Sequence, residues 1–234
     1  MSDQTGALPR YLQISELLIR DIAAGRLPDG SRLPPERDLA AELGVAVGTL
    51  RKALDDLAGK GLLERVQGSG NYVRARADVP SIYAMFRLEL PDGGGLPTAE
   101  VLSVQRLVKP ATLPHFGTAP EAHRIRRLRR LSGIAVAIEE IWLDGDYSAQ
   151  LEPSALSQSL YLHYRRALGL WIQRAEDRIG LGTVPDWAPP GFPLPEGAPA
   201  GHILRIGWAQ DNMRAEVSHT WFDPARAQYV ARLT

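Results

Sequence analysis

The chain has 234 residues, and its 44% hydrophobic and 23% charged residues are enough for a packed core and exclude global disorder. Its 27 basic and 27 acidic residues give no net charge, so any affinity for nucleic acid has to come from a local basic surface. The absence of cysteine excludes disulfide frameworks and thiolate zinc sites, and the absence of a long apolar run or secretory signal predicts a soluble cytoplasmic protein without a membrane anchor.

The first 76 residues are predicted to form a domain of three helices followed by a hairpin. Apolar residues recur at helical spacing from Tyr11 to Ile22, and Gly25 is a suitable helix end. A short second helix is predicted at 36–43 and a third at 47–58. Alternating segments on both sides of the turn at 68–71 predict two strands joined by glycines.

Residues 77–97 are predicted to be a linker with a flexible hinge, because proline and glycine surround one short apolar segment there. Residues 98–234 are predicted to form a second domain of the α+β class. Strands are expected at 101–109, 123–131, 134–143, 172–182, 202–210 and 213–222, with a helix near 155–168. Six prolines between 185 and 199 predict a long ordered loop.

The second and third helices have the spacing of a helix-turn-helix. Counting from Glu36 as the first position, small residues occupy the fifth and ninth positions (Ala40 and Gly44), and apolar residues occupy the fifteenth and eighteenth (Leu50 and Ala53). Small residues let two helices approach across a sharp turn, and the second helix can then enter a major groove. The following hairpin is predicted to be a wing that reaches phosphate or the minor groove through basic residues: Arg65, Arg74 and Arg76.

The segment from Leu8 to Val73 resembles the winged helix of GntR-family bacterial transcription regulators. It carries L-P-x-E-R, A-x-x-L-G-V, T-[VL]-R-x-A-L and G-L-[LI]-x-x-x-x-G-x-G-x-[FY]-V almost throughout. The resemblance implies a domain that binds double-stranded operator DNA. The implied DNA-binding residues are Arg37, Val47, Thr49, Arg51, Lys52, Gln67, Gly68, Ser69 and Gly70.

Two positions depart from the family pattern. Ala46 and Val47 stand where the family usually has Ser-Arg, and Pro35 replaces the usual cap serine of the second helix. A missing cap costs about 1 kcal/mol, so packing must hold the third helix. Without the family's arginine, base readout is expected to depend on Thr49, Arg51 and contact of Val47 with a thymine methyl group.

The C-terminal half resembles the UTRA effector domain of the HutC subfamily, which has a chorismate-lyase-like fold with an antiparallel sheet. The matching segments are RLRRLSGIAVAIEE, SLYLHYRRALGL and AEVSHTWF, although Ala135 replaces the family's proline and the R-G-D-R-Y ending is degraded to DPARAQY. The resemblance implies that the domain binds a small-molecule effector, either a phosphorylated sugar or a carboxylate. The implied effector-binding residues are Arg127, Arg129, Glu139, Glu216, Trp221 and Phe222.

Arg127 and Arg129 are two residues apart, so on a strand they share one face, which suits bidentate capture of an anion. An alternative for these arginines and glutamates is an internal ion-pair network that supports the sheet. The five histidines have no metal-ligand spacing, and we expect no metal, cofactor or catalytic residue.

The predicted function is an effector-controlled transcriptional repressor that binds an inverted repeat as a homodimer, because one winged helix reads too few base pairs. Two alternatives stay open: a constitutive DNA-binding dimer whose second domain only dimerises, and a lyase-like enzyme.

Overall fold

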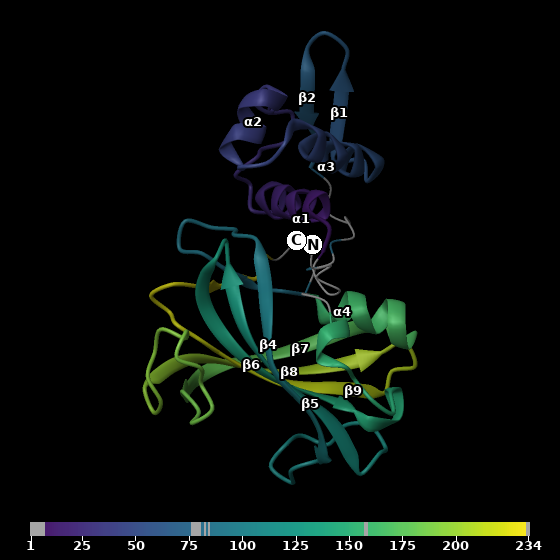
Figure 1. Cartoon of the computed structure of the whole chain (residues 1–234), viewed down its shortest axis with the longest axis vertical. Coiled ribbons are helices and arrows are strands. Elements are labelled where there is room, and N and C mark those ends of the chain that lie inside the picture. Colours follow the sequence, from purple (N-terminus) through teal and green to yellow (C-terminus); the bar gives the residue numbers. More distant parts are fainter. Residues whose placement is uncertain (1–7, 76–80, 82, 84, 157–158, 233–234) are drawn as a thin grey trace. The chain divides into compact units, whose positions relative to one another are not determined.

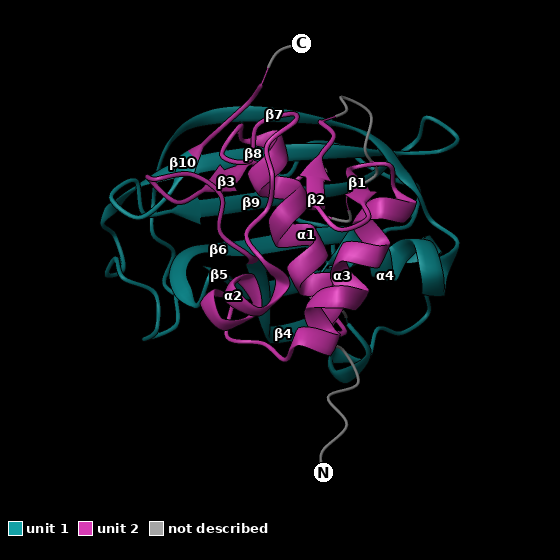
Figure 2. Cartoon of the chain, turned by 90° about the horizontal axis from the view of Figure 1, so that it is seen from above, with its two compact units in different colours: residues 1–7, 97–228 teal, residues 8–96, 229–234 magenta. Residues whose placement is uncertain are grey.

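The computed structural model describes residues 8–75, 81, 83, 85–156 and 159–232. Its contacts divide the chain into two compact units, which Figure 2 shows in separate colours. The described residues of one unit lie within 8–96 and 229–232, and those of the other lie within 97–228. The expected domain boundary, residue 76, is one of the residues 76–80, which lie outside the described residues. None of the helices in the described ranges has both the length and the apolar character needed to span a membrane.

The unit of residues 8–96 contains the expected three helices and hairpin. Helices α1 (Arg10–Ala23), α2 (Glu36–Glu42) and α3 (Val47–Gly59) precede strands β1 (Leu63–Val66) and β2 (Gly70–Val73). Leu18, Leu54 and Leu57 form part of one buried core shared by the helices and the hairpin. The segment before α2 adds a third strand-like pairing, because the Leu33 amide donates to the Asn71 carbonyl at 2.9 Å. The fold is therefore a winged helix-turn-helix.

Part of the expected linker is structured. Strand β3 (Leu88–Glu89) pairs with β10 (Gln228–Tyr229), and the Glu89 carboxylate receives two hydrogen bonds from Arg232, at 2.7 and 2.9 Å. On the other side, the buried Arg20 of α1 donates to the Leu88 carbonyl at 2.7 Å. Residues 88–96 therefore belong to the winged-helix unit. Sequence periodicity did not reveal these two strands, because each is only two residues long.

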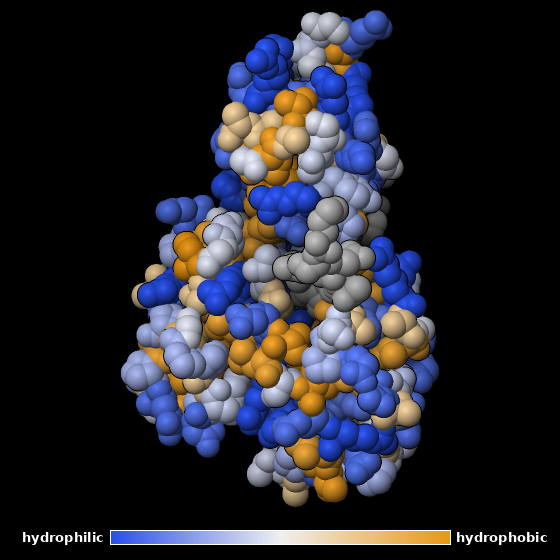
Figure 3. Space-filling model, in the orientation of Figure 1, coloured by the Kyte–Doolittle hydropathy of each residue, from blue (hydrophilic) through white to orange (hydrophobic). Residues whose placement is uncertain are grey.

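The second unit is built around a six-stranded antiparallel sheet with the strand order β4-β5-β6-β9-β8-β7 (Figure 1). Its strands, in chain order, are β4 (Pro97–Val108), β5 (Glu121–Leu131), β6 (Ile134–Asp144), β7 (Ile172–Thr183), β8 (Pro199–Ala209) and β9 (Arg214–Phe222). Each of the six overlaps a strand expected from the sequence, with ends that differ by a few residues, and the fold class is confirmed. On the face shown in Figure 3, apolar side chains occur in small groups interrupted by hydrophilic ones.

The single helix expected near 155–168 is replaced by three short elements. A 3-10 turn at Pro153–Ala155 is followed by α4 (Leu160–His163) and a π-helical turn at Tyr164–Leu168. Residues 157 and 158 lie outside the described residues. The Ser159 hydroxyl caps α4 by accepting from the Leu162 amide at 3.4 Å, so a new helix begins there.

The proline-rich segment 185–199 contains no helix or strand before Pro199, the first residue of β8. Two hydrogen bonds between residue 184 and residues 197 and 198 close this loop, each at 2.9 Å. Phe192 packs with Leu128 and Ile138 of the sheet. The loop therefore covers part of one sheet face.

Candidate functional site

The turn between α2 and α3 has the geometry that the sequence spacing predicts. Gly44 adopts a left-handed φ of +61°, and the Val45 amide donates to the Ala40 carbonyl at 2.9 Å. Ala40, Leu50 and Ala53 are all at most 1% exposed. The small residue at position 40 and the apolar residues on α3 thus fix the recognition helix against the core.

The residues predicted to bind DNA lie on the outside of this unit or are half-buried. Arg37, Arg51 and Lys52 are exposed on α2 and α3. At the wing tip, Gln67 and Gly68 are exposed, while the half-buried positions of the predicted set are Val47, Thr49, Ser69 and Gly70. The structure therefore distributes the predicted contacts over α2, α3 and the wing, and α3 and the wing are the elements that a winged helix places on DNA.

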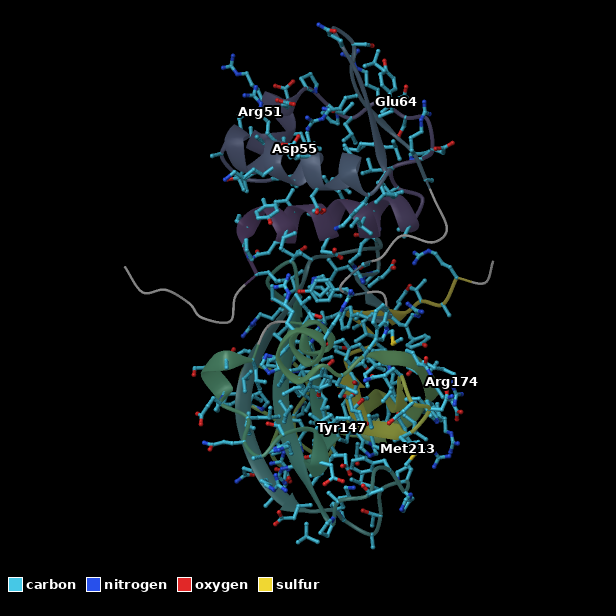
Figure 4. All side chains as sticks on the ribbon, turned by 90° about the vertical axis from the view of Figure 1, so that its right-hand side faces the viewer. Arg51, Asp55, Glu64, Tyr147, Arg174 and Met213 are labelled. Carbon is cyan, nitrogen blue, oxygen red and sulfur yellow. The ribbon has the colours of Figure 1, made fainter. Side chains whose placement is uncertain are left out.

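Ion pairs occupy several of the basic side chains around α3. Arg51 Nε lies 2.6 Å from Glu36 Oε2, although the Arg51 side chain is 64% exposed. Arg65 Nη1 lies 2.6 Å from Asp55 Oδ1 and joins the wing to α3, and Arg74 Nε donates to Glu64 at 2.9 Å. Figure 4 shows Arg51 and Asp55 on α3 and Glu64 on the wing. Arg76 lies outside the described residues.

The wing turns at a glycine that no other residue replaces easily. The Ser69 amide donates to the Val66 carbonyl at 2.9 Å, and Gly68 has a φ of +76°. No heavy atom lies within 4 Å of where a Gly68 Cβ would be, so the open side of the turn is free for a duplex groove. A 2.7 Å hydrogen bond between the Ser69 and Tyr72 hydroxyl groups holds the Ser69 side chain in place.

The N-terminus of α3 lacks a side-chain cap. Ala46 has the extended N-cap conformation, with φ −66° and ψ 143°, and no side-chain hydrogen bond. Because the backbone is already in cap geometry, we expect Ala46→Ser to raise the free energy of unfolding by about 1 kcal/mol. Urea denaturation of the full chain measures this, with the exposed Ala41→Ser as the control. Equal effects of the two substitutions would contradict the cap argument.

The second predicted site lies on one face of the large sheet. Residues that face each other in antiparallel register share a face, and the register pairs Arg127 with Glu139, and Asp177 with Arg205. Strand β9 places Glu216 on the same face as Glu139, because the β6–β9 register pairs Glu139 with Thr220 without a bulge. These side chains therefore come from five neighbouring strands.

Arg127, Arg129 and Glu139 form a buried charge cluster. Arg127 Nη2 donates to Glu139 Oε2 at 2.6 Å, and Arg129 Nε lies 3.6 Å from the other carboxylate oxygen. The three residues are 5%, 2% and 8% exposed. Burial opposes ionisation of Glu139, but the two arginines outweigh it and hold the pKa of this carboxyl below its ordinary value. The structure thus brings together three of the four charged residues predicted for the effector site.

Glu216, the fourth, lies in a different environment on the same face. Its Oε1 accepts a hydrogen bond from the Tyr161 hydroxyl at 3.1 Å, and its side chain is 2% exposed. Burial raises the pKa of Glu216, opposed by Tyr164, Tyr161 and the nearby guanidinium groups of Arg205 and Arg127. Burial also raises the pKa of Tyr161 and of Tyr164, so both phenols keep their protons.

Arg205 and Asp177 complete the polar cluster and were not predicted from the sequence. Arg205 Nε and Nη2 donate to the two Asp177 carboxylate oxygens, each at 2.6 Å. Their register across β7 and β8 became known only from the structure. Tyr161 belongs to the segment SLYLHYRRALGL that resembled the family, but spacing alone did not indicate that its hydroxyl faces Glu216.

The raised pKa of Glu216 predicts a pH-dependent effect of Glu216→Gln. The unfolded chain releases this proton near pH 4.3, whereas the folded chain retains it to higher pH, so wild-type stability falls as the pH rises above 4.3. Because glutamine does not titrate, we expect the variant to be more stable than the wild type at pH 7. The difference should shrink toward pH 4. Thermal unfolding across this range tests it, with the exposed Glu196→Gln as control.

Trp221 was predicted to line the effector site together with Glu139 and Glu216, but it does not share their sheet face. Trp221 pairs with Ile138 and His202 and therefore lies on the opposite sheet face from Glu139. There it stacks on His219 at 5.6 Å and meets the edge of Trp187 at 5.8 Å. Trp221 is five residues from Glu216, and an odd separation on a strand changes the face.

Phe222 shares the face of Glu216 but lies six residues farther along β9. Its ring packs over Gly201, where a Cβ atom would come within 2.3 Å of it. No contact between Phe222 and the four charged residues is present among the described interactions. Its predicted role in effector binding stays a prediction.

A winged helix with an exposed recognition helix, followed by a sheet unit with a buried polar cluster, defines a DNA-binding transcriptional regulator. Residues 10–73 match the bacterial regulatory proteins of the gntR family, and residues 92–228 match the UTRA domain. The chain belongs to the gntR family and carries a UTRA domain in its C-terminal half.

Named relatives agree with this assignment. The chain is 60% identical over 233 residues to the HTH-type transcriptional regulator SmoD of Agrobacterium fabrum, with 100% of both chains covered. It is 26% identical to the HTH-type transcriptional repressor NagR of Bacillus subtilis, covering 95% of this chain and 90% of that one. The crystal structure of the possible transcriptional regulator YydK from Bacillus subtilis has the same fold, with a TM-score of 0.54 at 19% identity, covering 97% of this chain and 100% of that one.

Proposed function

We propose that the protein is a repressor whose operator affinity is controlled by an anionic small molecule bound at the cluster of Arg127, Arg129, Glu139 and Glu216. The observation that carries the proposal is the burial of two arginines around a single carboxylate on one face of the UTRA domain. Such a group of charges is costly to bury for structural purposes alone. A ligand that completes it offers a reason for its presence.

The two arginines of the cluster favour an anion. Arg127 and Arg129 share Glu139, while Arg205 is matched by Asp177. Burial raises the pKa of Glu216, the second carboxyl group of the cluster. Two guanidinium groups held on one sheet face suit the phosphate of a phosphorylated sugar or a carboxylate. Glu216 and Tyr161 would then bind the hydroxyl groups of the ligand.

The proposed assembly is a homodimer on an inverted repeat, with one recognition helix in each half-site. This role places the protein with the chromosome in the bacterial cytoplasm. In this role the buried charge cluster of the UTRA domain binds a ligand and catalyses no reaction. Exposed side chains on α3 and the wing would contact the duplex. The affinity should fall steeply as the salt concentration rises, because the release of counterions from the DNA then becomes less favourable.

The test begins with an operator selected from random duplexes by the full chain. Sugar phosphates and sugar carboxylates are then titrated against the complex, with the corresponding uncharged sugars as controls. We expect an anionic compound to release the operator from the wild type. Arg129→Ala should abolish this response and leave operator binding without effector intact, whereas Arg130→Ala, a partly exposed neighbour paired with Glu100, should retain the response.

Other outcomes would replace the proposal. If no anionic compound changes operator affinity, the constitutive dimer is the better description. If a compound is converted to product, the lyase-like alternative is correct. Sedimentation of the operator complex decides whether two chains bind together.

A further inference from the structure

One end of the sheet unit carries three arginines stacked on tryptophan rings. The Arg165 guanidinium lies 4.5 Å from the ring centre of Trp171, and that of Arg174 lies 3.6 Å from the ring centre of Trp208. Arg214 approaches the same Trp208 ring at 5.7 Å. Stacking holds the Arg165 and Arg174 guanidinium planes in place while their outer edges can form hydrogen bonds, and Arg214 Nη1 donates to the His115 carbonyl at 3.2 Å.

Two groups of residues make up this surface: Arg165 with Trp171, and Arg174 and Arg214 with Trp208. The register joins Arg174 to Trp208, and Trp208 to Arg214. The Trp171 amide donates to the Gln210 side chain at 2.8 Å, which ties the start of β7 to the β8–β9 turn. Figure 4 shows Arg174 and Met213 on the same side of the unit. We name this surface the arginine–tryptophan patch, formed by Arg165, Trp171, Arg174, Trp208, Met213 and Arg214.

Most other arginines of residues 97–228 pair with carboxylates, although Arg124, which lies over the Trp142 ring, and Arg166 have no such ion pair among the described residues. The eight paired arginines are Arg106, Arg126, Arg127, Arg129, Arg130, Arg178, Arg205 and Arg226. Within the described part of the chain, none of the three patch arginines has a carboxylate partner in an ion pair. Segments 164–174 and 208–214 contain one acidic residue, Asp211, which accepts a hydrogen bond from the Met213 amide. The patch is therefore a positively charged surface.

The patch also exposes large apolar groups beside these charges. The exposed fraction is 53% for Trp171 and 47% for Met213. Trp, Met and Arg are the residues enriched at protein–protein interfaces, and lysine, which is depleted there, is absent from segments 164–174 and 208–214. The bases of duplex DNA are stacked inside the helix and cannot cover the exposed indole and thioether, so a protein partner fits this surface better than duplex DNA.

We propose that the arginine–tryptophan patch binds an acidic, partly apolar segment of another protein. Carboxylates of the segment pair with the stacked guanidinium groups, and its apolar side chains cover Trp171 and Met213. This binding site lies outside the proposed effector cluster and adds a protein partner to the regulator.

The experiment uses the full chain to select from a displayed library of short random peptides. We expect enrichment of sequences that combine aspartate or glutamate with large apolar residues. Labelled copies of an enriched peptide are then titrated against the wild type and against the double variant Arg165→Ala, Arg174→Ala, for which we expect affinity to fall about tenfold or more. The matched control is the double variant Arg178→Ala, Arg226→Ala, which removes two exposed arginines that already have carboxylate partners.

Three kinds of result would overturn the proposal. The first comes from the peptide experiment: the selected pool lacks acidic sequences, or the patch variant and the control variant bind the peptide with equal affinity. The second is displacement of the peptide by duplex DNA that lacks the operator, which would define a nucleic-acid surface. The third is loss of self-association in the patch variant, which would assign the patch to a second copy of the chain. Retained operator binding by both variants verifies their folding and separates this test from that of the proposed function.

Discussion

Replacing Glu139 with alanine is expected to destabilise the sheet unit by about 3–5 kcal/mol, because breaking a buried ion pair leaves charge without compensation. Glu139 lies between Arg127 and Arg129, and its removal leaves two buried guanidinium groups near each other without the carboxylate between them. Urea unfolding of the full chain, followed by the fluorescence of the tryptophans, measures the change. All five tryptophans lie in residues 97–228, so the signal reports on this unit.

The matched control is Glu100→Ala. Glu100 pairs with Arg130 at 3.4 Å, but its side chain is 59% exposed, so we expect a loss of at most about 1 kcal/mol. The lowered pKa of Glu139 adds a second criterion. Its stabilising contribution is present above the unfolded pKa near 4.3 and is lost as the pH falls through the lower folded value. A Glu139→Ala effect as small as that of the control would show that the cluster tolerates unpaired charge.

Arg51→Ala is expected to weaken operator binding by about 1–3 kcal/mol, which is roughly fivefold to more than a hundredfold. Arg51 is exposed on α3 and, in the absence of DNA, pairs with Glu36. Binding a base or phosphate therefore requires the guanidinium to exchange one anionic partner for another. Anisotropy titration with the selected operator measures the loss.

Two further variants make this result specific. Arg10→Ala removes an exposed arginine from α1 and should leave operator affinity almost unchanged. Glu36→Gln releases Arg51 from its ion pair and should not weaken binding. If Arg51→Ala binds as tightly as the wild type, α3 is not the helix that reads the operator.

The sequence was most informative where function depends on local spacing. The positions of Ala40, Gly44 and Leu50 determine a helix-turn-helix within one short segment, so both its helices and its turn could be predicted. Arg127 and Arg129 could likewise be placed on one face, because alternation on a strand is a local property. Pairing between distant strands is not local, and the register of Asp177 with Arg205 could not be derived in this way.

Other differences have equally specific causes. Trp221 was assigned by its position in a motif, although the odd separation from Glu216 already indicated the opposite face. The helix expected at 155–168 followed from apolar spacing, which does not show that Ser159 starts a new helix. Strands β3 and β10 are held by Arg20 and Arg232, long-range partners that leave no periodic pattern.

The strand order of the sheet also determines when the polar cluster can exist during folding. Arg127, Arg129 and Glu139 belong to the β5–β6 hairpin, whereas Asp177 and Arg205 belong to the β7–β8 hairpin and Glu216 to β9. The two groups meet only when β6 pairs with β9, a contact between segments far apart in the chain. Such non-local pairing is slow, because the loop must close before any contact is gained.

A ligand that touches both groups therefore recognises a chain whose sheet is already complete. It stabilises the native state by about 2.7 kcal/mol at a concentration of 100 times its Kd, and it leaves earlier folding steps unaffected. Its kinetic signature is slower unfolding at an unchanged folding rate. For a regulator, the occupied site then also prolongs the lifetime of the folded protein, so that degradation in the cell would depend on the same small molecule as operator release.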